Sequence, residues 1–165
     1  MVQKIEVLNP YNENHVKLFT TYDQKNQITD GISKKLENIR KQYTEEEFRQ
    51  HERKKPEITR TIFLEKDGRI SSYCNLHGEK DRKLCQLMLG PVENLKGAEQ
   101  LLQSAEKYAF DTLGMEELIF LDSKKSFFPS KYFLNHNYES LGEESEQIIY
   151  MKSKVLEPKN SYQIL

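Results

Sequence analysis

Residues 84–121 have the sequence LCQLMLGPVENLKGAEQLLQSAEKYAFDTLGMEELIFL, and this stretch decides the fold. Its first part, Leu84 to Leu89, is an apolar run closed by a Gly-Pro pair, which is typical of a strand. From Ala98 to Thr112, small and apolar residues recur at three- and four-residue steps and predict a helix, with Gly114 at the position of a C′ residue. Glu117 to Leu121 is typical of a strand buried on both faces. The order strand, helix, strand predicts a right-handed crossover between two parallel neighbours.

Upstream of this stretch, the sequence predicts two further strands. Thr59 to Glu65 is rich in β-branched and aromatic residues, and Asp67-Gly68 follows with the residues of a two-residue hairpin turn. Arg69 to Leu76 is then the return strand, and a second turn over Gly78–Asp81 leads to the strand that begins at Leu84. The three strands together predict an antiparallel meander.

The first third of the chain predicts one strand and three helices. Val2 to Leu8 alternates polar and apolar residues, which indicates a strand. Helical spacing follows Asn12, a candidate N-cap, and returns in a second stretch from Ile32 to Tyr43. A third helix is expected to begin at Thr44, because Glu47 three residues later completes a capping box.

The last third predicts a short helix and a closing strand. The helix begins at Pro129, and Asn137 can adopt the left-handed conformation that ends it. The closing strand runs from Gln147 to Lys152. We therefore expect one α+β (α/β) domain over residues 1–153, in which helices flank a mixed, mostly antiparallel sheet of six or seven strands, and a C-terminal tail over residues 154–165.

The composition restricts the partners of the protein. Its 165 residues carry 25 Lys and Arg against 26 Asp and Glu, and a net charge of −1 lacks the positive field that non-specific nucleic-acid binding needs. No apolar run approaches the roughly 18 residues of a membrane span, and no signal peptide is recognisable, so we expect a cytoplasmic protein that binds neither nucleic acid nor membrane. Cys74 and Cys85 form no metal-ligand pattern, so no metal is expected. Both are expected to be reduced thiols that could face one another across a hairpin.

Three segments carry a resemblance to a known family. A Gly-Pro pair follows the strand that ends at Leu89, and the Leu101-Leu102 pair lies inside the next helix. Further on come Tyr132-Phe133 and the run from Asn137 to Gly142. Together these segments resemble the acyl-CoA loop and the FYEKLGF helix end of the GNAT superfamily of N-acetyltransferases, of which the chain would be a divergent member. Over residues 58–152 the resemblance implies transfer of an acetyl group from acetyl-CoA to a small amine or a peptide amine, by direct attack on the thioester. The resemblance is compatible with a homodimer but does not require one.

The resemblance implies a phosphate site at the start of the long helix, where backbone amides point at the pyrophosphate of coenzyme A. The sequence departs from the family's Gly-rich pattern there. In one alignment Lys96 falls on a family glycine. In the other, Gly97 falls on a family glycine, but the alignment needs a one-residue deletion. We expect the amides of Gly97 and Ala98 and the ammonium of Lys96 to hold the phosphates. The alternative is an ordinary helix start in which Gly97 is merely tolerated.

The resemblance also implies groups that act in the reaction. Amides at the end of Met88–Gly90, Leu89 included, are expected to polarise the thioester carbonyl, and Ser126 stands where the family has an Asn that forms hydrogen bonds. The family's general acid is a Tyr, but Phe133 falls on that position and cannot donate a proton. Tyr132 can take the role only if the helix is rotated or shifted by one residue; otherwise both rings only pack.

No motif identifies a general base. Glu79, His77 and Glu65 are candidates near the expected cleft, and a water relay would need none of them. His77 is as easily a surface residue at a hairpin end. The charged run from Glu45 to Lys55 is typical of a solvated helix face, although in the family the corresponding region borders the acceptor site.

Two further function classes remain open. A non-catalytic GNAT-fold module would keep a ligand cleft without turnover, and the altered loop and Phe133 both favour it. A protein interaction domain would use exposed sheet edges and the C-terminal tail.

Overall fold

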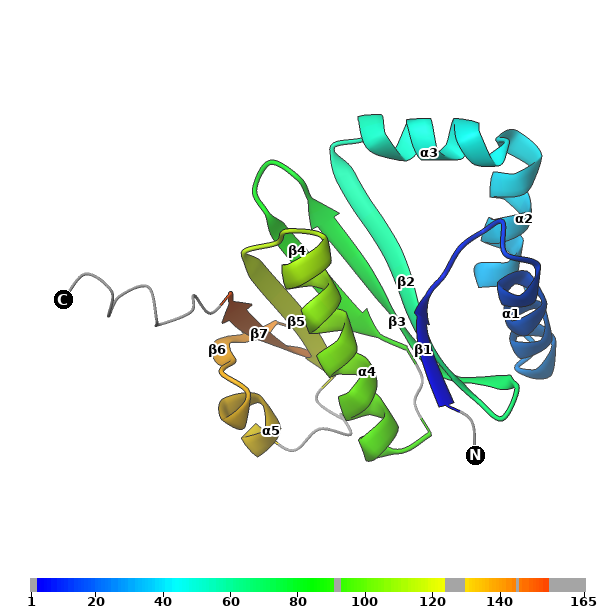
Figure 1. Ribbon diagram of the computed structural model, residues 1–165. Coiled ribbons are helices and arrows are strands. Elements are labelled where there is room, and N and C mark those ends of the chain that lie inside the picture. Colours follow the sequence, from blue (N-terminus) through cyan, green and yellow to red (C-terminus); the bar gives the residue numbers. More distant parts are fainter. Residues whose placement is uncertain (1–2, 91–92, 124–129, 145, 155–165) are drawn as a thin grey trace.

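A computed structural model describes residues 3–90, 93–123, 130–144 and 146–154. One seven-stranded sheet with the order β1-β2-β3-β4-β5-β7-β6 forms its centre (Figure 1). In chain order the elements are β1 Gln3–Val7, α1 Glu13–Lys25, α2 Ile32–Gln42, α3 Glu45–Lys54, β2 Glu57–Lys66, β3 Arg69–Glu79, β4 Leu84–Leu89, α4 Leu95–Lys107, a π-helical turn Tyr108–Thr112, β5 Glu117–Ser123, α5 Ser130–Asn135, β6 Glu139–Glu144 and β7 Gln147–Ser153.

The mixed α+β class and its single parallel strand pair are confirmed. β4 and β5 run parallel from Leu84 opposite Glu117 to Met88 opposite Leu121, and α4 forms the connection between them. Every other neighbouring pair in the sheet is antiparallel. Pairing between β4 and β5 ends at Met88 although β5 continues to Ser123 and stays paired with β7. The two parallel strands therefore part at their C-terminal ends.

Helices cover the two faces of the sheet unequally (Figure 1). On one face, α4 and α5 bury the larger core, which includes Leu101, Leu102 and Phe133. On the other face, α1 and α2 cover only the part near β2 and β3, through a smaller cluster of Leu18, Phe19, Leu36, Phe63 and Ile70. The helix α3 buries no residue and extends from the end of α2 to the start of β2.

The predicted helix caps and the first predicted hairpin turn are confirmed. Asn12 caps α1 and accepts a hydrogen bond from the amide of His15. Thr44 and Glu47 form the expected capping box at the start of α3. Asp67 and Gly68 both have positive φ, as a type I′ hairpin turn requires.

The long helix ends differently from the prediction. Its last residues, Tyr108–Thr112, form a π-helical turn in which the amide of Leu113 donates to the carbonyl of Tyr108. The wider turn places both Ala109 and Phe110 in the core and leaves Thr112 exposed. Gly114 closes the helix with a φ of +72°, as expected of a C′ residue.

The second hairpin turn lies later in the chain than the sequence predicts. Gly78 and Glu79 belong to β3, and the turn occupies residues 80–83, with Lys83 at a φ of 53°. Gly78 lies in the sheet opposite Ile58 and Cys85, and a Cβ there would come within 3.0 Å of the Met115 side chain. The space at this glycine is thus limited by the Met115 side chain and the carbonyl of Leu84, and the glycine does not belong to a turn.

The two cysteines do not face one another, which corrects the expectation from their positions. Cys74 pairs with Leu89, whereas Cys85 pairs with Gly78. Both thiols are free and buried. Burial raises the pKa of Cys74 to about 12 and that of Cys85 to about 11, so both stay protonated at neutral pH.

Three expectations concern residues outside the described ranges. Pro129, Ser126 and all of the C-terminal tail beyond Lys154 lie there. Within the described ranges, none of the helices combines the length and the apolar character that crossing a bilayer demands.

Candidate active site

A row of four residues crosses the sheet at the level where β4 and β5 part. Thr61, Asn75, Met88 and Leu121 occupy neighbouring positions on β2, β3, β4 and β5. Neighbours in register lie on one face of a sheet, here the face that carries α1 and α2. The hydroxyl of Thr61 donates to the side-chain oxygen of Asn75 at 2.7 Å, and Met88 is 48% exposed. The strand opening, as we call this parting at Met88 and Leu121, is therefore accessible from the face of α1 and α2.

The backbone that follows Met88 is held against β3. The amide of Gly90 donates to the carbonyl of Tyr73 at 2.8 Å, and a Cβ at Gly90 would approach the same oxygen to 2.9 Å. Only glycine allows the two chains to come so close. Because peptide groups alternate in direction along a strand, the peptide of Leu89 faces β5 instead.

The start of α4 is capped by Asn94, the residue just before the helix. Asn94 accepts a hydrogen bond from the amide of Gly97 at 2.8 Å, and its carbonyl accepts from the amide of Ala98 at 3.2 Å. Gly97 is buried, and a Cβ there would lie 3.3 Å from the side chain of Leu64. Lys96 is exposed on the opposite side of the first turn. The two amides expected to hold phosphate already have acceptors, which leaves the cation of Lys96 and the earlier amides of the turn.

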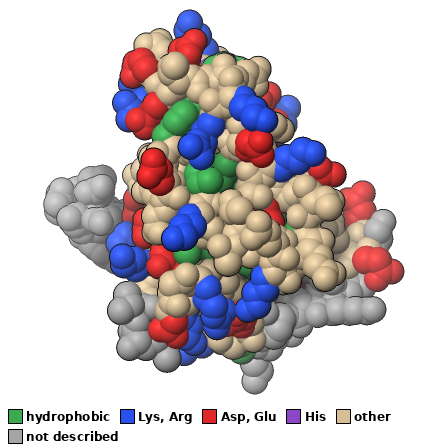
Figure 2. All heavy atoms as spheres, turned by 90° about the vertical axis from the view of Figure 1, so that its right-hand side faces the viewer, with side chains coloured by type: hydrophobic (Ala, Val, Ile, Leu, Met, Phe, Trp, Pro, Cys, Tyr) green, Lys and Arg blue, Asp and Glu red, His purple; other side chains and the backbone are tan. Residues whose placement is uncertain are grey.

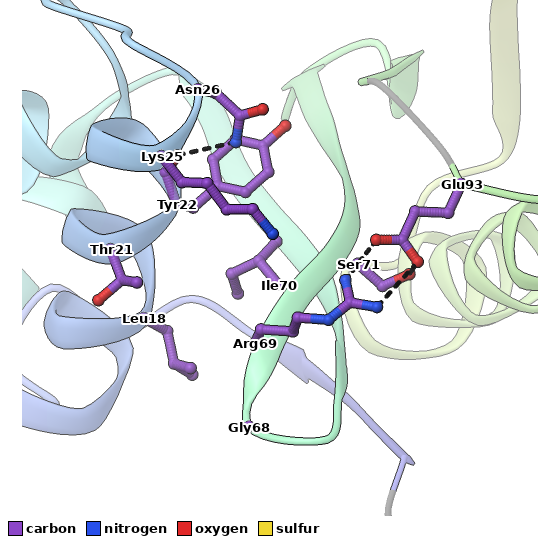
Figure 3. A pocket seen from close by; sticks show the side chains of 10 residues that line it. All are labelled: Leu18, Thr21, Tyr22, Lys25, Asn26, Gly68, Arg69, Ile70, Ser71 and Glu93. Atoms are coloured by element: carbon purple, nitrogen blue, oxygen red, sulfur yellow. Dashed lines mark hydrogen bonds and ion pairs between the residues drawn. The ribbon is translucent and has the colours of Figure 1, made fainter.

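An ion pair fixes the segment that precedes α4, as Figure 3 shows. Arg69 at the hairpin of β2 and β3 donates to the Glu93 carboxylate from its two terminal guanidinium nitrogens. The hydroxyl of Ser71 donates to the same carboxylate at 3.2 Å. The hydrogen bond from Arg69 lowers the pKa of Glu93. A cavity of 180 Å³ lies between this ion pair and α1, which is smaller than the usual ligand pocket of about 300 Å³ or more.

The aromatic pair on α5 belongs to the core. Phe133 is fully buried and stacks on Tyr150, with ring centroids 3.9 Å apart. Tyr132 stacks on His136, with ring centroids 4.0 Å apart, and its hydroxyl lies near Gln103 of α4. Burial, and next the charge of Glu106, raise the pKa of Tyr132 to about 12. Both rings thus lie in the core.

Glu106 in α4 forms a buried polar network that the sequence analysis missed. One carboxylate oxygen accepts from the hydroxyl of Tyr138 at 2.5 Å, and the other accepts from the ammonium of Lys152 at 2.9 Å. Burial and the charge of Glu106 raise the pKa of Tyr138 far above its ordinary value. The sequence did indicate that Glu106 is buried, because it lies four residues after Leu102 and therefore on the apolar face of the helix.

The base candidates lie at different levels of the sheet. Glu79 pairs with Leu84 at the far end of β4 from the strand opening, and it forms an ion pair with Arg82. Four residues of strand separate that level from Met88, or roughly 13 Å. Glu65 lies towards the opposite end, opposite Lys4 of β1. The structure therefore brings neither carboxylate to the strand opening.

His77 comes closer. It occupies the row next to that of Asn75, opposite Gln86 of β4, and it is exposed on the face of α1 and α2. Its ring nitrogen lies 3.5 Å from the hydroxyl of Thr59.

A second cavity, which we call the α3 groove, has a volume of 990 Å³. Its floor is the start of β2 with Asn75, and its walls are α2, α3 and the segment after β1. Figure 2 shows small hydrophobic patches among charged side chains of both signs on the side of the molecule where α1 and α2 lie. Thr61 and Asn75 belong both to the groove and to the row at the strand opening. The groove therefore leads to the place where β4 and β5 part.

Several solved N-acetyltransferases have a similar fold. PseH from Campylobacter jejuni matches with a TM-score of 0.58 and 17% identity, over 92% of this chain and 99% of that chain. PaiA from Thermoplasma acidophilum, solved with coenzyme A, matches with a TM-score of 0.54 and 14% identity, over 93% of this chain and all of that one (100%). FdhC, described as a nucleotide-linked sugar GNAT, matches with a TM-score of 0.57 and 18% identity, over 98% and 89%.

The sequence itself matches no protein-family model and no curated protein. The chain has the fold of the GNAT N-acetyltransferases, so the fold that the resemblance implied is confirmed. Low identity to each of these structures makes it a divergent example of that fold.

Proposed function

We propose that the protein is an acyl-CoA-dependent N-acetyltransferase that moves the acetyl group of acetyl-CoA to an amine. One observation carries the proposal: β4 and β5 part at Met88 and Leu121, next to the start of α4. The parted strands leave room for the thioester arm, and the helix start supplies positive partial charge for the pyrophosphate.

The reaction needs few side chains. The amine nitrogen attacks the thioester carbonyl carbon, the carbon–sulfur bond breaks, and the thiolate of coenzyme A leaves with the electron pair. Of the amides predicted to polarise the carbonyl, that of Gly90 is engaged by Tyr73, so we assign the role to Leu89, whose peptide faces β5. The proton lost by the amine passes to water in the open groove, with His77 as the nearest of the side-chain candidates.

Tyr132 is a poor acid for the leaving thiolate. A thiol has an ordinary pKa near 8.5, whereas the pKa of Tyr132 is raised to about 12. Proton transfer from Tyr132 to the thiolate would therefore be uphill. We infer that the thiolate leaves without a side-chain acid and takes its proton from water.

The test of this function has two parts. Saturating acetyl-CoA is expected to raise the melting temperature, because a ligand of the native state stabilises it. Release of the coenzyme A thiol in the presence of amines then measures turnover, and the buried protonated Cys74 and Cys85 contribute little background. Unchanged melting at millimolar acetyl-CoA would refute any role linked to coenzyme A.

A non-catalytic binding module is the second candidate. It is favoured by the core position of Phe133 and by the internal partners of the Gly97 and Ala98 amides. Stabilisation by acetyl-CoA without thiol release from any amine would identify this module.

Replacement of Lys96 by Ala is expected to weaken coenzyme A binding by roughly 5- to 150-fold, the equivalent of one charge-assisted hydrogen bond of about 1 to 3 kcal/mol. Added salt should mask part of this loss. Lys107→Ala is the matched control, because Lys107 is exposed in the last turn of the same helix. Calorimetric titration with coenzyme A measures both. If Lys96→Ala and the wild type bind coenzyme A with equal affinity, the phosphates do not bind at this helix start.

A further inference from the structure

The ion pair of Arg69 and Glu93 lies at the end of α4 where the phosphates of coenzyme A are expected. Glu93 directly precedes Asn94, the N-cap of the helix. Three donors converge on its carboxylate, namely the two terminal nitrogens of Arg69 and the hydroxyl of Ser71. Figure 3 shows both side chains reaching from β3 towards Glu93. Among the described basic residues, Arg69 alone comes within 4.0 Å of this carboxylate and is therefore its counterion.

A bulge in β3 supports this contact. Ser71 is an extra residue of the strand, because its neighbours Ile70 and Ser72 pair with consecutive residues of β2. A bulge bends its strand and re-aims side chains, and bulges are common next to active sites. Here Ile70 packs in the smaller core cluster with α1, while the adjoining Ser71 donates to Glu93 at 3.2 Å. The bulge thus lets one short segment serve both the core and the carboxylate.

The ion pair contributes little to folding. The side chains of Arg69 and Glu93 are 44% and 40% exposed, and water and salt screen a pair that is open to solvent to this degree. The hydrogen bond from Arg69 lowers the pKa of Glu93, so the carboxylate is charged at neutral pH. The position of this charge, rather than its strength as a contact, points to a role in ligand binding.

A negative charge at Glu93 would act against phosphate binding. From Glu93 to Lys96 the chain spans at most about 11 Å, which is close to the screening length of about 10 Å in 0.1 M salt. A phosphate beside Lys96 would therefore be repelled by an uncompensated carboxylate at Glu93. The guanidinium of Arg69 cancels most of this repulsion, because it is in direct contact with the carboxylate.

We propose that Arg69 is a positioning residue for coenzyme A: it neutralises the Glu93 carboxylate and keeps it on the hairpin of β2 and β3, so that phosphates bind at the start of α4 without repulsion. The inference rests on the proposed function for the acetyl donor. Arg69 acts through Glu93 and stays bonded to it in the complex. A residue of β3, outside the helix start, thus takes part in the affinity for the donor.

The two partners are expected to have opposite effects, which a shared structural role would not produce. Arg69→Gln leaves the carboxylate uncompensated and should weaken coenzyme A binding roughly 3- to 10-fold. Glu93→Gln removes the negative charge and should strengthen binding by a similar factor. The double variant should return to the wild-type affinity. Calorimetric titration with coenzyme A measures all of them, and raising the salt from about 0.05 to about 0.5 M should reduce the differences.

Lys83 and Glu116 supply the matched control. They form an exposed ion pair at 3.6 Å, just before β4 and β5, and so at the opposite end of these strands from the strand opening. Lys83→Gln and Glu116→Gln change the net charge of the protein by the same amounts as the two test variants. Both should bind coenzyme A like the wild type. Equal effects at the control pair would show a response to net charge alone and would overturn the role of Arg69.

The same titrations separate this inference from the proposed function. A wild-type protein that does not bind coenzyme A would refute both. If the wild type binds and Arg69→Gln and Glu93→Gln both bind more weakly, the pair is only a tether of the helix start, and the inference alone is overturned. Unchanged affinity in both variants would overturn it as well. The melting temperatures, expected to stay close to that of the wild type because the pair is exposed, show that the variants are folded.

Discussion

Phe133→Ala is expected to lower the free energy of unfolding by about 3 to 5 kcal/mol, because it removes a fully buried ring and leaves a cavity. The ring stacks on Tyr150 and contacts Phe120, Tyr132 and Tyr138 edge-on or tilted. Denaturation by urea, followed by circular dichroism, measures the change. Leu134→Ala is the matched control, since its side chain is 69% exposed on the same helix and should change stability by less than about 0.5 kcal/mol.

Phe133→Tyr tests the catalytic side of the same position. It restores the hydroxyl that the family has there, but among buried aromatic rings, so we expect a loss of about 1 to 3 kcal/mol in stability and no gain in turnover. A variant that is faster than wild type in thiol release would show that this position faces the leaving thiolate and that its role is not confined to packing.

Removal of Glu106 is expected to have an effect of similar size. Glu106→Leu leaves the partly buried ammonium of Lys152 without its carboxylate and the hydroxyl of Tyr138 without its acceptor. Such a broken pair costs about 3 to 5 kcal/mol of stability. Urea denaturation at pH 7 measures this loss as well.

The double variant Glu106→Leu with Lys152→Met separates two explanations. If the loss comes from an uncompensated charge, the second substitution should restore most of the stability, because apolar residues of similar size can replace a buried ion pair. Equal instability of the single and the double variant would mean that Glu106 contributes through packing and not through its charge.

The sequence predicts local features of this fold well. The crossover from Leu84 to Leu121 follows from two apolar runs and one helical repeat, each of which is set by residues close in the chain. The capping box at Thr44 and the turn at Asp67-Gly68 are local as well. Gly78 shows the limit, because a glycine inside a strand that packs against the distant Met115 has the same sequence signal as a turn glycine.

The candidate site was less predictable, because its contacts join distant residues. Arg69 and Glu93 are 24 positions apart, and Glu106 and Lys152 are 46 apart. No periodicity relates such pairs. The internal partners of the Gly97 and Ala98 amides depend on the side chain and carbonyl of Asn94, whose capping role was not recognised in the sequence. The α3 groove required the spatial arrangement of several segments that are separate in the chain.

The attachment of α3 has a consequence for the motion of the backbone. The helix buries no residue, and the described contacts hold it mainly at its two ends, by the hydroxyl of Tyr11 on the carbonyls of Tyr43 and Thr44 and by the ammonium of Lys80 on those of Glu52 and Arg53. Local unfolding of α3 exposes little apolar surface, so its amide hydrogens should exchange with deuterium much faster than those of the buried strand β3. The molecule thus combines a rigid sheet with one helix that can open without unfolding the rest.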